Sequence, residues 1–330
     1  MSAIWRKLPP KAAYLTVDNP ASRNALSLPV LRNLRSQLHK YNTSPADGKI
    51  YTLPPFNPNI LSSLEKASTQ PWSHTKHAWL LHTAEWHRHR RDLPTVLVLR
   101  SIPGFSSGNE LKELSRLSHD EVSETFTLFA EVMTLIRRSP APVVCAVEGG
   151  RAAAAGAQLA LTCDLPIAFA GTRFQLPGQR IGLPGTLPAT AVSRRLGPAF
   201  GYRMSALAEG VRADELPGGV VETVPDGDDY ALKKRVEGVV SQLVEVGGRP
   251  QALGKWAYWT QLEAHRWTGD ADRWTEDGEI EDEADGYEKA LRWAGRMMAL
   301  HARTDDAQKG MAAFGQEGAR VEHVLNKKIW

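Results

Sequence analysis

The sequence predicts an α/β protein in which mainly parallel strands alternate with helices. Two short apolar runs, at residues 96–99 and 143–147, have the length and composition of buried strands. Between them, apolar side chains recur at helical spacing from Val122 to Ile136. Small residues follow both runs, where the chain turns toward the next helix. This alternation favours a parallel sheet, because parallel strands need a long crossover between them.

Local signals mark the expected elements in order along the chain. Residues 13–17 form a candidate strand, and Ser27 can cap the helix that follows it. Ser118 and Glu121 make a capping box before the helix of residues 122–136. The remaining expected elements are strands at residues 165–169 and 220–224, helices at residues 154–162 and 230–243, and a largely helical end from about residue 250.

The regular pattern breaks down in a segment rich in Pro, Asn, His and Trp, at residues 41–93. We expect a long irregular insertion there, with helical pieces around residues 60–67 and 77–89. An acidic insertion is expected at residues 269–286. These features divide the chain into a core of residues 1–249, which contains the first insertion, and a C-terminal helical region of residues 250–330.

Length and composition are those of a globular protein rather than a membrane or nucleic-acid-binding one. The 330 residues are 42% apolar and 23% charged, and the formal net charge is only +3. Because the basic residues are dispersed and no apolar run approaches about 20 residues, we expect no nucleic-acid partner and no membrane span. Cys145 and Cys163 lie in apolar stretches, which predicts reduced core cysteines in an intracellular protein. Residues 1–11 are too short for a convincing targeting peptide.

The turn at residues 104–112, Gly-Phe-Ser-Ser-Gly-Asn-Glu-Leu-Lys, is the first candidate for chemistry. A strand that breaks into small residues before a helix exposes backbone N–H groups, which can stabilise a developing negative charge. The same residues contain the G-x-S-x-G pattern of serine hydrolases, centred on Ser106. That motif needs a later acid and a histidine on loops, whereas His265, His301 and His323 lie in helical-looking sequence. The sequence therefore favours backbone donors over a serine nucleophile.

A second turn of this kind follows the next strand, at residues 148–158. Its alanines and glycines open a helix with little side-chain bulk, so a ligand could approach the backbone at the positive end of the helix dipole. Close packing of the helix on the sheet would explain the same residues. Taken with the first turn, however, one N–H from each could hold a single carbonyl oxygen.

Several blocks, in order over most of the chain, resemble the crotonase superfamily of enoyl-CoA hydratases and isomerases. The matching blocks are residues 19–20, 23–26, 105–111, 146–149 and on to 163–164, 174–177, 182 and 306–314. The resemblance implies a crotonase-like ββα spiral core and C-terminal helices used for trimerisation, and therefore a homotrimer or hexamer. It also implies an acyl-CoA or enoyl-CoA thioester as the ligand, with coenzyme A as part of the substrate, no tightly bound cofactor and no metal. The resemblance favours the mitochondrion, with the cytoplasm as the alternative.

Carried over position by position, the resemblance implies roles for two sets of residues. The backbone N–H groups of Asn109 and Ala155 would form an oxyanion hole, and Gly156 would shape its second half. The residues implied in coenzyme A contact are Arg23, Ala25, Ser107 and Lys112. A cation at Lys112 suits the adenosine phosphates.

Two departures from the family pattern bear on the chemistry. Hydration of an enoyl thioester needs one group to activate water and another to deliver a proton, and family hydratases supply two glutamates. Gln158 and Gly178 stand at those positions here. Each loss would cost about 10²–10⁴ in rate, because neither residue can titrate. Glu110, Glu148 and Asp164 fall at positions that the resemblance marks as structural, and Asp164 is expected to be a capping carboxylate.

The sequence thus leaves the reaction open. One hypothesis is an acyl-CoA-processing enzyme of the hydratase/isomerase type with altered chemistry. A second is a non-catalytic acyl-CoA-binding protein or assembly partner. A thioester hydrolase or decarboxylase of the same fold would depend less on the missing pair of glutamates.

The first insertion carries clustered histidines and evenly spaced tryptophans. The histidines lack the paired cysteines or the H-E-x-x-H geometry of strong metal motifs, so we expect a solvated basic helix end. Tryptophans that recur every seven residues predict packing of an added helix. The acidic residues 276–285 are expected to form a solvated surface that could pair with the basic segment. The residues concerned are His74, His77, His82, His87 and His89, with Arg88, Arg90 and Arg91, and Trp72, Trp79 and Trp86.

Overall fold

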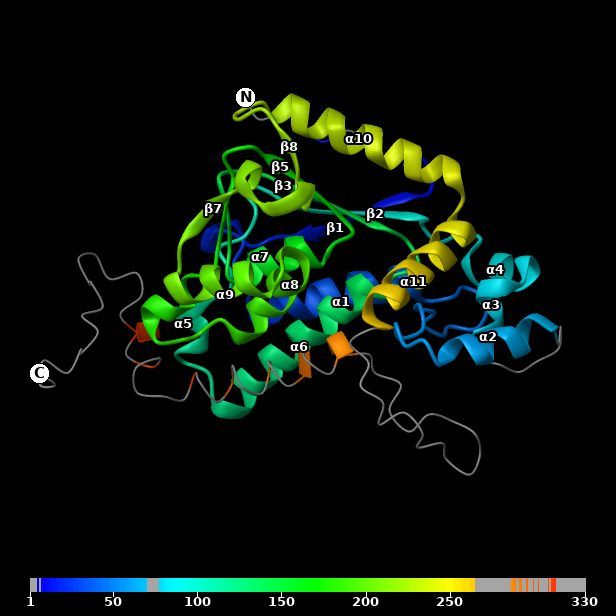
Figure 1. Ribbon diagram of the computed structural model, residues 1–330, viewed down its shortest axis with the longest axis horizontal. Coiled ribbons are helices and arrows are strands. Elements are labelled where there is room, and N and C mark those ends of the chain that lie inside the picture. Colours follow the sequence, from blue (N-terminus) through cyan, green and yellow to red (C-terminus); the bar gives the residue numbers. More distant parts are fainter. Residues whose placement is uncertain are drawn as a thin grey trace, which may run out of the picture.

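The computed structural model describes residues 7–69 and 77–264, together with Trp5 and scattered positions between residues 286 and 312. A five-stranded parallel sheet in the order β1-β2-β3-β5-β8 forms its centre (Figure 1). A smaller sheet, β4-β6-β7, has one parallel and one antiparallel pairing. The predicted α/β class with a parallel sheet is therefore confirmed. The strands are β1 Ala12–Val17, β2 Val96–Ser101, β3 Val143–Val147, β4 Arg151–Ala153, β5 Leu165–Phe169, β6 Arg173–Gln175, β7 Gly210–Arg212 and β8 Glu222–Val224.

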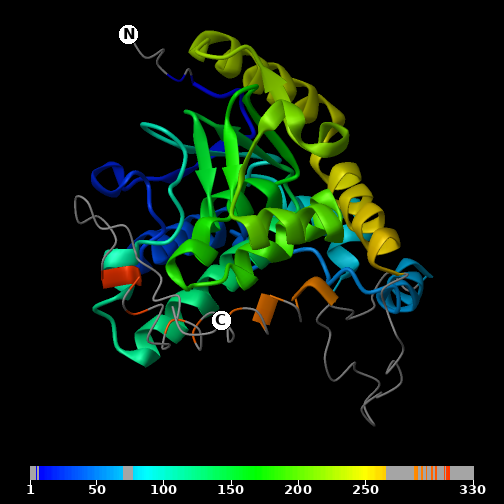
Figure 2. The same cartoon turned by 60° about the vertical axis from the view of Figure 1, so that its left-hand side comes forward.

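Helices cover both faces of the five-stranded sheet. Alternate residues of β2 show the division, because Val96 and Val98 pack with α10 whereas Leu97 and Leu99 belong to the core on the other face. In Figure 2, α10 and α11 follow one another along the outside of the molecule. The other face is covered by α1, α6, α7 and α8. The helices are α1 Leu28–Asn42, α5 Leu111–Leu114, α6 His119–Arg137, α7 Ala155–Thr162, α8 Thr186–Leu196, α9 Pro198–Leu207, α10 Asp229–Val246 and α11 Gly248–Ala264, with 3-10 helices η1 Pro20–Ser22 and η2 Pro177–Ile181.

Both predicted helix caps are present. The Ser27 hydroxyl accepts a hydrogen bond from the Val30 N–H at 3.4 Å at the start of α1. At the start of α6, the Ser118 hydroxyl accepts from the Glu121 N–H while the Glu121 carboxylate accepts from the Ser118 N–H at 2.8 Å. These reciprocal bonds satisfy N–H groups that the helix itself leaves without acceptors.

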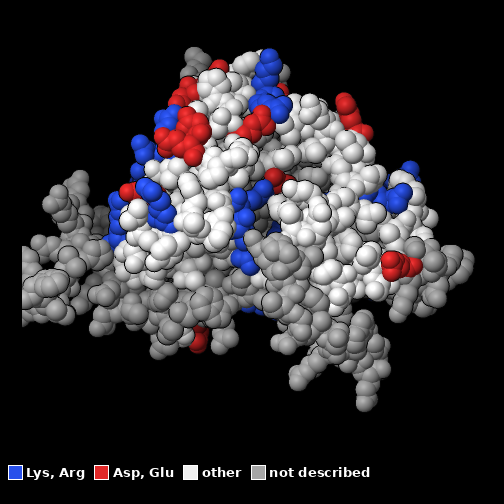
Figure 3. Space-filling model, viewed as in Figure 1, with Lys and Arg blue, Asp and Glu red and all other residues white. Residues whose placement is uncertain are grey.

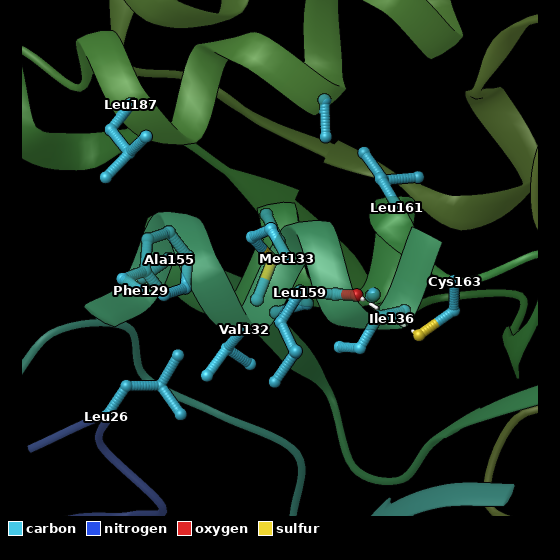
Figure 4. Packing of buried hydrophobic residues seen from close by; sticks show 14 of the residues in the cluster. Leu26, Phe129, Val132, Met133, Ile136, Ala155, Leu159, Leu161, Cys163 and Leu187 are labelled. Atoms are coloured by element: carbon cyan, nitrogen blue, oxygen red, sulfur yellow. Dashed lines mark hydrogen bonds between the residues drawn. The ribbon is translucent and has the colours of Figure 1, made fainter. Parts of the chain in front are cut away.

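The core beneath the sheet is built around α7. Figure 4 shows Ala155 and Leu159 of α7 among Phe129 and Met133 of α6 and Leu187 of α8. All of α7 is buried, which its small side chains allow because they let neighbouring helices approach closely. Close packing thus explains the alanines of this helix, in addition to any role of its first turn.

The first insertion is more regular than the sequence predicted. Three helices form within it, and they pack against α11 through a separate apolar cluster that includes Phe56, Trp79, Trp86 and Trp256 (Figure 1). The expected helical pieces are therefore present, and the prediction that tryptophans pack an added helix is confirmed for Trp79 and Trp86. Trp72 lies outside the described residues. The three helices are α2 Ile60–Thr69, α3 Ala78–Leu81 and α4 Thr83–Arg90.

The prediction of a solvated basic helix end is wrong for His77, which is buried, and for two residues of α4. His89 is buried, with Nδ1 3.1 Å from the Ser44 hydroxyl and its ring stacked on Tyr51. Arg90 is also buried, stacks on the Trp86 ring and donates only to uncharged oxygens, such as Asn42 Oδ1 at 3.3 Å. Desolvation lowers the pKa of Arg90 to about 9. Tertiary packing has drawn both side chains into the joint between the insertion and the core.

Asp164 is structural, but it does not cap a helix as predicted. Its Oδ2 accepts from the Val143 N–H at 2.8 Å, at the start of β3, and pairs with Lys255 Nζ at 2.7 Å. The carboxylate therefore joins β3 to α11. Cys145 and Cys163 are buried free thiols, as the sequence predicted.

Surface charge is mixed on the face shown in Figure 3, where Lys and Arg side chains are interspersed with Asp and Glu side chains. In the described part of the chain, no helix combines the length and the apolar character needed to span a bilayer. The residues 269–285 of the acidic insertion lie outside the described residues.

Candidate functional site

A cavity of about 430 Å³ opens beside the two small-residue turns. Its walls come from η1, the turn before α5, α5 itself, β4, β6, η2 and the start of α8. The structure thus brings together segments that are far apart in the sequence. The predicted site residues that line the cavity are Arg23, Ala25, Ser107, Asn109, Lys112 and Gly178.

The two turns touch each other at Gly108. This glycine has a left-handed φ of +97°, and a Cβ built on it would lie 2.8 Å from the Ala153 carbonyl oxygen and 2.8 Å from the Ala154 Cβ. The same point is 3.4 Å from the Ala155 nitrogen. Only glycine allows this approach, so Gly108 fixes Asn109 next to the start of α7.

Backbone donors are available on both sides of this contact. Ala155 is the first residue of α7, so the helix offers no acceptor for its N–H. Within the described part of the chain, the Asn109 N–H also donates to no backbone acceptor, although Leu26 N donates to the adjacent Gly108 carbonyl at 2.7 Å. Ala155 is fully buried and is not among the residues that line the cavity, whereas Ala153 and Ala154 are. The two turns therefore place the Asn109 and Ala155 N–H groups, neither with a described backbone acceptor, on the two sides of the contact at Gly108.

Ser106 braces the turns and does not line the cavity. It is buried, and its hydroxyl donates to the Asn24 carbonyl at 2.8 Å. The Asn24 side chain in turn donates to the Pro103 and Gly104 carbonyls at 3.0 Å each. The hydroxyl of the serine in the G-x-S-x-G pattern is therefore hydrogen-bonded to the backbone. His265, His301 and His323 lie outside the described residues.

Gly156 keeps the start of α7 close to this brace. A Cβ on Gly156 would lie 2.6 Å from the Ser106 carbonyl oxygen, closer than packed atoms tolerate. Gly156 therefore sets how near α7 comes to the first turn, and it is itself buried behind the cavity.

The cavity lining is strongly cationic. Four basic side chains and a single carboxylate, Glu110, belong to it. The neighbouring Glu113 carboxylate accepts from the Leu28 N–H at 3.2 Å, and burial raises the pKa of Glu113. Among the described residues, no group of three or more His, Cys, Asp or Glu side chains is placed to hold a metal ion. The basic residues are Arg23, Lys112, Arg151 and Arg180.

Sequence reasoning missed two of these four cations, Arg151 and Arg180. Arg151 shares one face of β4 with Ala153, since side chains alternate along a strand. Arg180 lies two residues after Gly178 in η2. Neither arginine can be recognised as a cavity residue from the sequence, because only the structure shows that the cavity lies against β4 and η2.

Comparison with known proteins identifies the family. The sequence model described as enoyl-CoA hydratase/isomerase matches residues 84–249. The chain belongs to this family, within the crotonase superfamily. It is 30% identical over 251 residues to the enoyl-CoA hydratase domain-containing protein 3, mitochondrial, of Mus musculus, which covers 75% of this chain and 67% of the relative. The corresponding protein of Rattus norvegicus is 29% identical over 250 residues, with the same coverage of each chain.

Solved structures agree with this assignment of the fold. The crystal structure of human enoyl-CoA hydratase domain-containing protein 3 has a TM-score of 0.56 at 24% identity, with 94% of this chain and 95% of that chain covered. An enoyl-CoA hydratase of Mycobacterium smegmatis has a TM-score of 0.56 at 25% identity, with 93% and 94% covered. This likeness extends over nearly the whole length of each chain.

In this enoyl-CoA hydratase/isomerase family member, Gln158 is not among the residues that line the cavity. The side chain is fully buried in α7, and its terminal amide lies against the carbonyl oxygens of Leu187 and Pro188; the amide orientation that satisfies these acceptors turns its nitrogen toward them, 2.9 Å from that of Pro188. An amide N–H₂ group can donate there, whereas an ionised carboxylate would meet only acceptors. Gln158 therefore holds α7 against α8.

Gly178 lines the cavity, but the backbone around it leaves no room for a side chain. A Cβ on Gly178 would lie 2.1 Å from the Leu183 carbonyl oxygen. The segment also closes on itself through a hydrogen bond from the Leu183 N–H to the Gly178 carbonyl at 3.0 Å. Neither Gln158 nor Gly178 therefore offers a titratable group to the cavity of this family member.

Proposed function

We propose that the chain binds an acyl-CoA or enoyl-CoA thioester and holds its carbonyl oxygen with the N–H groups of Asn109 and Ala155. The observation that carries this proposal is the contact of the two turns at Gly108, directly beside a cationic cavity. Two converging donors stabilise an oxyanion or enolate more strongly than the neutral carbonyl, which is the basis of an oxyanion hole. Gly156 supports this arrangement by letting α7 approach the first turn.

Coenzyme A would occupy the side of the cavity formed by η1 and α5. Arg23 and Lys112 supply positive charge for its phosphates, and neither makes an ion pair or a side-chain hydrogen bond to another described residue. Ala25 and Ser107 leave room for the rest of the carrier. Coenzyme A would arrive as part of the substrate, with no tightly bound cofactor.

The reaction proposed is of the hydratase/isomerase type with altered chemistry. Hydration by two carboxylates is disfavoured, because Gln158 faces α8 and the backbone at Gly178 excludes a side chain. The same two observations favour a second candidate function, a non-catalytic acyl-CoA-binding protein or assembly partner. A thioester hydrolase or decarboxylase would also need neither position.

The assembly and location of the protein are proposed from its family. We expect the ββα spiral of crotonases in residues 1–249, with the insertion at residues 41–93, and a C-terminal helical region in residues 250–330 that supports a homotrimer or hexamer. The rodent relatives named above are described as mitochondrial, which favours the mitochondrion over the cytoplasm.

Calorimetric titration with CoA, butyryl-CoA and crotonyl-CoA tests the proposal, with loss of enoyl absorbance as the measure of hydration. We expect both thioesters to bind and crotonyl-CoA to be hydrated slowly or not at all. Ala155→Pro removes the N–H in question, with the fold of the variant checked by its melting curve, and Ala155→Gly keeps the N–H. Losing one hydrogen bond should weaken butyryl-CoA binding about tenfold in Ala155→Pro only.

An infrared measurement tests the proposed hydrogen bonds to the thioester carbonyl without a variant. The carbonyl stretch of bound butyryl-CoA should shift to lower frequency, because hydrogen bonds polarise the thioester. An unshifted stretch in the bound ligand, or equal affinities of Ala155→Pro and Ala155→Gly, would contradict the oxyanion hole. Absence of any thioester binding would contradict the whole proposal.

A further inference from the structure

Two arginines of the cavity have no role in the function proposed above. Arg151 is the first residue of β4, and Arg180 lies in η2. Both line the cavity and both are exposed. They belong to the wall formed by β4, β6 and η2, whereas Arg23 and Lys112 belong to the wall formed by η1 and α5.

The small sheet shows that Arg151 is exceptional among its neighbours. Arg151, Arg173 and Arg212 are paired in register across β4, β6 and β7, so their side chains share one face. Arg173 Nη1 donates to the Gly210 carbonyl at 3.2 Å, and Arg212 pairs with Asp214 at 2.8 Å. For Arg151, the described residues offer no ion pair and no side-chain acceptor. The same is true of Arg180. Two guanidinium groups in one cavity wall that have no partner among the described residues indicate an anionic ligand.

The two cationic walls meet at the proposed oxyanion hole. Asn109 lies two residues before α5, in the first wall, and Ala154 directly follows β4, in the second. A thioester carbonyl held at this junction would direct coenzyme A along the first wall. Its acyl group would then extend along the second wall, past Gly178 and toward Arg180. Glu110 belongs to the first wall, so the described residues place no carboxylate in the second wall of the cavity.

On the basis of the proposed thioester binding, we propose that the acyl group itself ends in a carboxylate, which Arg180 and Arg151 bind. The substrate class is then an acyl-CoA thioester of a short dicarboxylic acid. The planar guanidinium group donates two parallel N–H bonds to a carboxylate, a geometry that a lysine does not provide. Because the second wall holds cations without acceptors, it should favour such an acyl group over an uncharged one of the same length.

Matched ligand pairs isolate the acyl carboxylate from coenzyme A. Succinyl-CoA differs from butyryl-CoA only by a carboxylate in place of the terminal methyl group, and malonyl-CoA and propionyl-CoA form a shorter pair. Because both members of a pair carry the same coenzyme A, the ratio of their affinities reports the acyl terminus alone. We expect a ratio of about 10–100 in favour of the carboxylated member of at least one pair, as for a charge-assisted hydrogen bond. Calorimetry of the full-length chain measures the ratio.

Three variants locate the effect. Arg180→Leu changes an exposed side chain, and it should bring the ratio close to 1 while butyryl-CoA affinity stays within about twofold. Lys112→Leu should weaken the binding of both members of a pair equally and leave the ratio of affinities unchanged, because Lys112 contacts the coenzyme A part that both members share. Arg173→Leu, in the neighbouring strand but outside the cavity lining, should change neither affinity.

The outcomes separate this inference from the proposed function. Wild-type ratios near 1 for both pairs, with all thioesters bound, would overturn the carboxylate site and leave thioester binding intact. The carboxylate site would also be overturned if Arg180→Leu lowered the affinities of both members of a pair equally, because Arg180 would then bind coenzyme A. Failure of every thioester to bind would refute the proposed function itself.

Discussion

Replacing Gly178 tests most directly whether the backbone leaves room for a side chain at the position where the family resemblance places a glutamate. The backbone of Gly178 does not lie in the left-handed region, so alanine meets no conformational penalty there. Its Cβ would instead lie 2.1 Å from the Leu183 carbonyl oxygen, which belongs to the backbone and cannot rotate away. The segment from η2 to Leu183 would have to open by more than about 1 Å to restore an ordinary contact.

The cost of Gly178→Ala follows from these contacts. Overpacking by one methyl group against backbone lies at the upper end of its usual range, about 3 kcal/mol. Strain in the hydrogen bond from the Leu183 N–H to the Gly178 carbonyl adds about 1 kcal/mol. For a chain of 330 residues, this loss corresponds to a fall in Tm of about 4–6 °C.

Calorimetric melting of Gly178→Ala beside Gly254→Ala measures the effect. Gly254 lies exposed within α11, and a Cβ there meets nothing within 4 Å, so alanine should stabilise the chain by about 0.5–1 kcal/mol. The two variants add the same methyl group and should shift Tm in opposite directions. If Gly178→Ala melts within about 1 °C of the wild type, the proposed closure of this segment is wrong.

The lack of space at Gly178 also predicts the outcome of an activity measurement. Introducing both family glutamates, with Gln158→Glu and Gly178→Glu, should not produce hydratase activity on crotonyl-CoA, because a carboxylate at 158 would meet the carbonyl oxygens of α8 and the backbone at 178 leaves no room for a side chain. Appearance of hydration at more than about 10² times the wild-type rate, the contribution of one acid/base group, would refute this reasoning.

Three further predictions concern groups outside the cavity wall. Gln158→Glu should destabilise the chain by about 2–3 kcal/mol at pH 7, because the new carboxylate faces carbonyl oxygens. The loss of stability should be smaller at pH 5, where protonation turns the carboxylate into a hydrogen-bond donor. Urea unfolding at both pH values measures the difference. Arg90→Met should cost about 2–4 kcal/mol of unfolding free energy, since the acceptors around the guanidinium lose their donors, whereas Arg91→Met at the exposed neighbour should stay within about 0.5 kcal/mol. Burial and the hydrogen bond to Asp47 raise the pKa of Tyr51 from 10.0 to about 12. Because the pKa of Tyr51 is higher in the folded than in the unfolded chain, the contribution of Tyr51 to the free energy of unfolding is complete below pH 10 and is lost as the pH rises to about 12. Tyr51→Phe should remove this loss of stability, together with the late step in a spectrophotometric titration of the tyrosines.

Much of the fold could be predicted from the sequence because its signals are local. The caps at Ser27 and Ser118 depend on residues three positions away, and buried strands are visible as short apolar runs. Most of the elements were therefore found within a few residues of their bounds. The three helices of the first insertion were only partly anticipated, since their stability comes from packing against α11 rather than from their own pattern.

The candidate site was predicted in part for the same reason. The family motifs identified Asn109, Lys112 and Gly178, and all three line one cavity. Arg151 and Arg180 escaped notice, because nothing in their neighbours reveals that two distant segments form a common wall. The burial of Arg90 escaped notice as well, since a basic cluster is usually solvated and only the fold supplies its acceptors.

The sequence by itself determined the α/β class and the family, and the family resemblance placed Gln158 and Gly178 where glutamates are expected. Only the tertiary structure decided what those two residues mean, because the meaning depends on distances between segments remote in the chain. Gln158 faces the carbonyls of α8, and Gly178 lies against the backbone of Leu183. Residue types are written in the sequence, whereas the space and the partners available to each side chain are set by packing.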